Sequence, residues 1–182
     1  MLDALRHPTT AALAALNALG GFAVLASYVW GLAQPAVAGG LWGGVPEGLR
    51  PLYTVSMFTA AAGYFPFTHY LVLRLDPDRA SLGTVGYGGL LFFYALILIP
   101  SALWLPLTAR MLRAPSEALW WTIRIDLFAV AAGSLGVLWA CAAATPRQPG
   151  RALAIAGALA FCLQTVVLDA LVWPWFFPRP TG

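Results

Sequence analysis

The stretch TVGYGGLLFFYALILIPSALWLP, residues 84–106, is predominantly apolar and contains no charged side chain. A helix that crosses the hydrocarbon layer of a bilayer needs about 20 predominantly apolar residues. The stretch is long enough for one complete crossing. It therefore predicts a transmembrane helix and places the chain among integral membrane proteins.

Further segments of similar length and composition lie on both sides of this stretch. Short connections rich in proline, glycine and arginine separate them, apart from a longer connection from Gln34 to Arg50. We predict an all-α integral membrane protein, one domain over residues 1–182, with five transmembrane helices in one bundle and the termini on opposite sides of the membrane. The predicted spans are Thr9 to Ala33, Pro51 to Arg74, Thr84 to Pro106, Glu117 to Ala144 and Arg151 to Pro174.

The composition of the whole chain supports a multi-pass protein in a lipid bilayer. Hydrophobic residues make up 60% of the 182 residues and charged residues only 9%, whereas soluble domains carry about 25% charged residues. A net charge of +3 is too small to indicate a nucleic-acid partner. Cys141 and Cys162 match no metal-binding or redox spacing.

The first five residues of the quoted stretch, Thr84 to Gly88, spell TVGYG, the sequence that forms the selectivity filter of potassium channels. In those channels a short apolar pore helix precedes the filter. Here the preceding residues are RLDPDRASLG, whose charges and proline leave no room for such a helix. We therefore interpret the glycines as the start of a closely packed helix and not as an ion filter.

Ionisable residues in the last two predicted spans are candidates for a site, because a charge inside a span is costly unless it is paired or hydrated. If the hairpin between these spans turns near Arg147, Asp126 and Asp169 share one depth in the membrane. Arg124 lies near the same level. Ser101 of the third span reaches that level by the same hairpin geometry.

We expect the fourth and fifth spans to pack face to face through two stripes of small residues, which would bring the two aspartates together. Two interpretations are open: an Arg–Asp pair that only tethers the helices, or a site that recognises a polar group of a ligand or handles a proton. The stripes are Asp126, Ala129, Gly133, Gly136 and Ala140, and Ile155, Ala158, Cys162, Thr165 and Asp169.

Aromatic residues gather towards the side of the long connection. Tryptophans commonly anchor a helix at the membrane interface, but this excess coincides with the level of the charged residues. We therefore predict an aromatic-lined pocket that opens towards the connection, with no catalytic or metal-binding residue. The candidate ligand-binding residues are Arg124, Asp126, Asp169, Trp104, Trp120, Tyr53 and Ser101.

Two short motifs carry a resemblance to a known family. The third span ends in Leu103-Trp104-Leu105-Pro106, and the fifth contains TVVLD, Thr165 to Asp169. Together with five spans and a long first connection, they resemble the TspO/MBR family, the tryptophan-rich sensory proteins related to the mitochondrial translocator protein. Asp169 stands where that family carries asparagine, and the family's Trp-Pro-Pro run is absent. The resemblance implies a loop-covered pocket for a porphyrin or a sterol-like molecule.

Three classes of function are consistent with these observations. The first is a membrane protein that binds an apolar or amphipathic small molecule, with a porphyrin as the one cofactor suggested. The second is a non-catalytic subunit or assembly factor that contacts partner membrane proteins or a second copy of the chain. The third is a membrane enzyme that acts on a lipid or sterol with the two aspartates as acid and base. The absence of any other catalytic pattern favours a protein that is not an enzyme.

Overall fold

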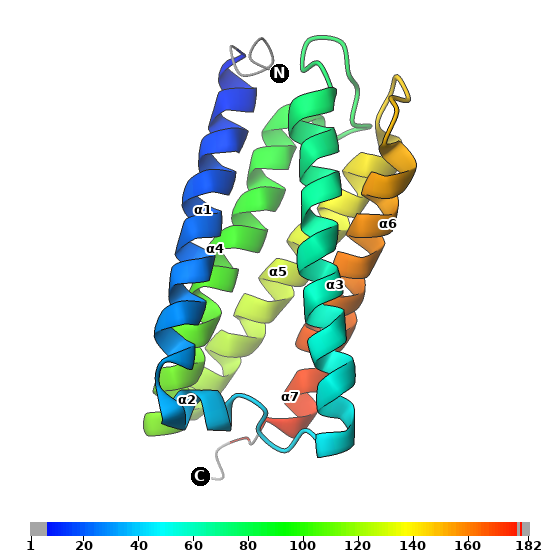
Figure 1. Cartoon of the computed structure of the whole chain (residues 1–182). Coiled ribbons are helices and arrows are strands. Elements are labelled where there is room, and N and C mark those ends of the chain that lie inside the picture. The colour runs from blue at the N-terminus through cyan, green and yellow to red at the C-terminus, as the bar shows by residue number, and fades with distance from the viewer. Residues whose placement is uncertain (1–6, 178, 180–182) are drawn as a thin grey trace.

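The long apolar segments are all helical, and a helix satisfies its backbone hydrogen bonds internally, as a chain surrounded by lipid requires. The structure is a computed structural model that describes residues 7–177 and 179. Within these residues there is no β-strand (Figure 1). The elements are α1 (Pro8–Leu32), α2 (Pro35–Gly40), η2 (Glu47–Leu49), α3 (Arg50–Thr68), η3 (His69–Arg74), α4 (Gly86–Arg113), α5 (Glu117–Ala143), α6 (Arg151–Cys162), η4 (Leu163–Val172) and α7 (Trp173–Phe176).

The long helices coincide with the predicted spans. The segment 50–74 is helical throughout, as α3 followed by η3, but it is not among the helices that are long and apolar enough to cross a membrane. The helical bundle is confirmed, a multi-pass membrane protein is supported, and a fifth crossing stays a prediction. The four helices that meet the length and hydropathy criteria are Pro8–Leu32, Gly86–Arg113, Glu117–Ala143 and Arg151–Phe176.

The helices pack side by side in an order that differs from their order in the chain. α4 packs between α1 and α5, and α6 packs between α5 and α3 (Figure 1). α1 and α3 meet through a hydrogen bond in which the hydroxyl of Tyr64 donates to Oδ1 of Asn17 at 2.5 Å. The start of α1 and the short helix α7 lie at opposite ends of the bundle. We name the end that carries α2 and α7 the long-loop end.

The TVGYG stretch forms a turn and the first residues of α4, as expected for a glycine-rich helix start. Gly83 and Gly86 have φ angles of 70° and 60°, which favour glycine, and α4 begins at Gly86. The helix does not end where the predicted span ends, because α4 continues past Pro106 to Arg113 with Pro100 and Pro106 inside it. Neighbouring helices allow a membrane helix to tolerate such prolines.

Glycines set the closest helix contacts. A Cβ on Gly63 of α3 would lie 2.6 Å from the carbonyl oxygen of Gly157 on α6. A Cβ on Gly133 of α5 would lie 2.7 Å from the carbonyl oxygen of Phe93 on α4, and Gly136 meets the same phenylalanine. The expectation that Gly133 and Gly136 face the fifth span is therefore wrong. α5 has neighbours on both sides, and its small face packs against α4.

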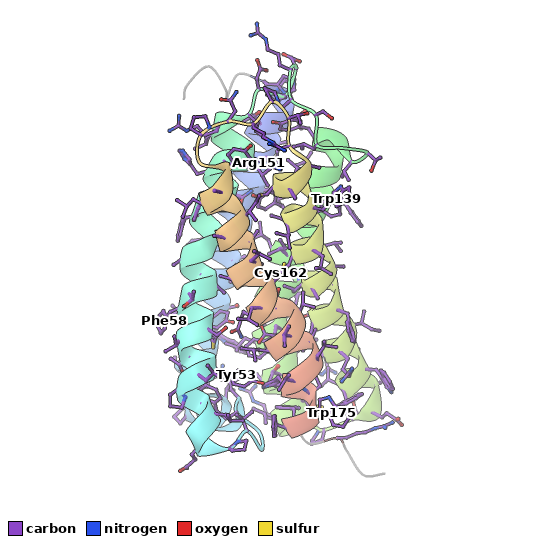
Figure 2. All side chains as sticks on the ribbon, turned by 90° about the vertical axis from the view of Figure 1, so that its right-hand side faces the viewer. Tyr53, Phe58, Trp139, Arg151, Cys162 and Trp175 are labelled. Carbon is purple, nitrogen blue, oxygen red and sulfur yellow. The ribbon has the colours of Figure 1, made fainter. Side chains whose placement is uncertain are left out.

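The interior holds two clusters of buried side chains, one towards each end of the bundle. The cluster at the long-loop end includes Tyr53 and Trp173. The partly buried Trp104 packs against this cluster. Figure 2 shows Tyr53 and Trp175 towards this end, and Trp139 and Arg151 towards the other. The aromatic candidates Tyr53 and Trp104 therefore lie at the long-loop end.

Candidate functional site

The long connection between α1 and α3 folds over the end of the bundle. The indole N–H of Trp173 donates to the carbonyl oxygen of Leu41 at 3.0 Å. The backbone N–H of Gly44 donates to the carbonyl oxygen of Phe176 at 2.7 Å. Val45 of the connection is fully buried. The connection is thus fixed to α7 and closes this end.

Aromatic rings from three helices form a wall beneath the connection. The ring of Trp104 on α4 lies 6.1 Å from that of Tyr28 on α1 and 5.8 Å from that of Trp173 on α7, measured between centroids. Trp173 in turn stacks on Phe177 at 4.3 Å. We name Tyr28, Trp104 and Trp173 the aromatic wall. It offers a rigid apolar surface to any molecule bound beside it.

The polar residues of this end lie on η4, a π-helical stretch of 10 residues within the last long helix. Nε2 of Gln164 donates to Oδ1 of Asp169 at 2.7 Å. The two residues are five positions apart, and one turn of π-helix, with its i to i+5 hydrogen bond, brings such residues to the same face. π-helical turns inside α-helices occur frequently at functional sites.

The carboxylate of Asp169 faces the middle of the bundle. The hydroxyl groups of Tyr28 on α1 and Tyr53 on α3 lie near it. The hydroxyl of Tyr53 also donates to the carbonyl oxygen of Leu168 at 3.4 Å. Protein atoms surround Asp169 on nearly all sides, yet its side chain keeps some accessible surface. The predicted residues Asp169, Tyr53 and Trp104 are therefore brought together.

Several buried polar atoms at this end have no hydrogen-bond partner within residues 7–177 and 179. Beside the aromatic wall and Asp169 they include Nε1 of Trp104 and Oε1 of Gln164, and Gln164 is only 5% exposed. Buried indole N–H groups and amide oxygens normally find a partner. Both atoms are closed off from solvent, so a ligand or a water molecule reaches them only where the neighbouring side chains move aside.

Arg124 and Trp120 are brought together, but away from the aspartates. The guanidinium carbon of Arg124 lies 5.1 Å from the ring centroid of Trp120 and 5.3 Å from that of Phe128. Phe128 is exposed on the outer face of α5, and these contacts are cation–π interactions. Arg124 forms no ion pair with Asp126 or Asp169 in the described part of the chain. The predicted Arg–Asp pair is therefore not formed.

Asp126 lies on the face of α5 that packs against α4. It precedes Gly133 by seven residues, which is nearly two helical turns, and Gly133 contacts α4. Asp169 instead faces α1 and α3, so an acid–base pair of the two aspartates is not formed. Oδ2 of Asp126 is buried without a partner among the described residues. Ser101 is half-buried on α4 and forms no hydrogen bond with either aspartate.

Other parts of the molecule contain fewer features of a binding site. The described residues contain no group of three or more His, Cys, Asp or Glu side chains that could hold a metal ion, and both cysteines are buried and free. A shallow groove runs along the outer surface between α1 and α4. Its apolar lining suits lipid chains and offers no polar recognition. The groove is lined by Gly20, Ala23, Leu98, Ile99, Ala102 and Leu103.

The candidate site thus combines one carboxylate, one amide and the aromatic wall inside a helical bundle of membrane-spanning length. No family model, curated protein or solved structure matches this chain. The resemblance to the TspO/MBR family stays a prediction that rests on the motifs around Trp104 and Asp169.

Sequence reasoning missed Tyr28, Gln164 and Trp173 as members of the site. Gln164 precedes Asp169 by five residues, a spacing that has meaning only in a π-helix, and apolar periodicity does not reveal one. Trp173 lies among the tryptophans expected at the membrane interface. Tyr28 carries no signal of its own, because a tyrosine near the end of a span is common in membrane helices.

Proposed function

We propose that the chain is a five-span membrane protein that binds an amphipathic small molecule at its long-loop end. The observation that carries this proposal is the carboxylate of Asp169, which is enclosed by the bundle and has no ion pair among the described residues. Such a group is costly in a membrane span unless a partner arrives, and it usually marks a functional site. The aromatic wall supplies the apolar side of the same site.

A sterol-like molecule fits this site better than a porphyrin. The carboxylates of a porphyrin need a cation, and Arg124 lies over Trp120 and Phe128 on the outer face of α5. A sterol-like body presents one small polar group to a large apolar surface. Its hydroxyl can donate to Asp169 while its rings lie against the aromatic wall.

Replacement of Trp104 by alanine is expected to weaken sterol binding about tenfold, because it removes the central ring of the aromatic wall. The measurement is a titration of the protein in nanodiscs with a fluorescent sterol and, separately, with protoporphyrin IX. Ligand fluorescence is followed, since the variants themselves lack a tryptophan.

The matched control is Trp139→Ala, which removes an exposed tryptophan from the opposite end of the bundle. This variant is expected to bind as the unchanged protein does. Equal weakening in both variants would contradict the location of the site. The absence of saturable binding to the unchanged protein would contradict the function itself.

Five crossings place the connection between α1 and α3 and the connection between η3 and α4 on opposite sides of the membrane, whereas four crossings place them on the same side. Glu47 and Arg79 are well suited to test this, because their side chains are 90% and 85% exposed. With Cys141 and Cys162 replaced by alanine, single cysteines at these positions report the topology. In sealed vesicles of uniform orientation, an impermeant maleimide is expected to label one and not the other. If the cysteines at both positions were labelled from the same side, the chain would cross the membrane only four times.

A further inference from the structure

Asp169 has no cationic side chain beside it among the described residues. Arg124, which the sequence placed near it, lies over Trp120. Arg50, also at the long-loop end, donates to the carbonyl oxygen of Val45 at 3.3 Å. An ionised carboxylate surrounded by membrane helices has to be neutralised. Either a proton or a cation carried by a ligand can do so.

The groups around the carboxylate can accept several N–H donors from one cation. The amide of Gln164 donates from Nε2 to Asp169, and its own Oε1 is buried without a partner within residues 7–177 and 179. A proton on Asp169 can donate to this Oε1, so a cation that binds here competes with that proton for both acceptors. A hydroxyl group has a single hydrogen to donate. An ammonium group can donate to the carboxylate and to the amide oxygen together.

The aromatic residues nearby suit the same kind of group. Tyr28 lies near Asp169, and its ring lies 6.1 Å from that of Trp104. Faces of tyrosine and tryptophan rings attract ammonium groups, and more strongly where water is excluded. The rings can therefore contact both a cationic headgroup and the apolar chain next to it.

We infer that Asp169 and Gln164 bind the protonated amine of an amphipathic molecule, whose apolar body lies against the aromatic wall. The inference rests on the proposed function and names the class of its ligand. The carboxylate supplies the opposite charge, the amide oxygen the second acceptor, and the wall the apolar contact. A neutral amphiphile can occupy the same place, but without the contacts at the carboxylate and the amide.

A series of ligands with one chain length tests this inference. Dodecylamine, dodecyltrimethylammonium and dodecanol share the same apolar chain and differ in the headgroup. Affinities are taken from the rise of the melting temperature of the protein in nanodiscs with ligand concentration. Dodecylamine is expected to bind at least about tenfold more tightly than dodecanol. Dodecyltrimethylammonium, which has no N–H, is expected to lose most of that advantage.

The variants make the test specific to the site. Asp169→Asn is expected to abolish the preference for the amine, whereas Asp126→Asn, which changes the buried aspartate on the α4 side, is expected to keep it. Gln164→Met, which removes the second acceptor, is expected to reduce the preference several-fold and serves if Asp169→Asn folds poorly. Equal affinity for dodecylamine and dodecanol, or equal loss in both aspartate variants, would overturn the inference. Failure of every ligand in the series, together with the sterol, would overturn the proposed function.

Discussion

Replacement of Trp173 by alanine is expected to lower the free energy of unfolding by about 3–5 kcal/mol, the usual cost of removing a buried tryptophan. The side chain is 6% exposed and stacks on Phe177. It also contacts Trp104 and donates to the carbonyl oxygen of Leu41. For a chain of this size the loss corresponds to a decrease of roughly 6–20 °C in the melting temperature, measured in detergent or nanodiscs.

The second consequence of this change is local. Without the bond from Trp173 to Leu41, the long connection should open more often, and a glutamate-specific protease should cleave after Glu47 more rapidly. The matched control is Trp175→Ala, two residues further along the chain, because Trp175 is 86% exposed. Its effect on unfolding is expected to stay within about 0.5 kcal/mol. Similar melting temperatures for the two variants would show that Trp173 does not hold this end together.

Replacement of Gly157 by alanine is expected to destabilise the bundle by about 1–3 kcal/mol, the usual cost of overpacking a close contact. The added methyl group would meet the carbonyl oxygen of Gly63 on α3. Backbone atoms cannot move aside as the end of a flexible side chain can, so α3 and α6 would have to separate. The expected decrease in the melting temperature is roughly 2–12 °C.

Gly21→Ala is the control for the effect of alanine on a helix. Gly21 lies within α1, and nothing stands within 4 Å of the position that a Cβ would take. Alanine is favoured over glycine inside a helix by up to about 1 kcal/mol, so this variant is expected to be neutral or slightly more stable. A Gly157→Ala protein as stable as the Gly21→Ala protein would contradict the close contact of α3 and α6.

The helical architecture could be predicted from the sequence because it depends on long runs of apolar, uncharged residues, which can be read directly from the sequence. The segments around residues 9–33 and 117–144 became α1 and α5 with ends shifted by only a residue. The end of α4 could not be predicted in the same way. A proline stops a helix in water more reliably than in a bundle whose neighbours can compensate for the lost hydrogen bond.

The site was predictable only in part, because hairpin geometry gives the depth of a residue but not the direction in which it points. Asp169, Trp104 and Tyr53 were expected at one end of the bundle and are found together there. Asp126 was expected beside Asp169, but its helix turns that face towards α4. The rotation of a helix depends on which neighbour its glycines touch, and both neighbours of α5 offer suitable apolar surfaces.

The meeting of α1 and α3 has a consequence for how a hydrophobic molecule could reach the interior. α1 packs chiefly on α4, and α3 packs chiefly on α6. The hydrogen bond from Tyr64 to Asn17 joins the two pairs across this boundary. Because α1 and α3 share few contacts, separating them costs less free energy than separating two closely packed helices. A hydrophobic molecule dissolved among the lipid tails would therefore enter most easily from the side, between α1 and α3. It would not require the long connection to detach from the end of the bundle.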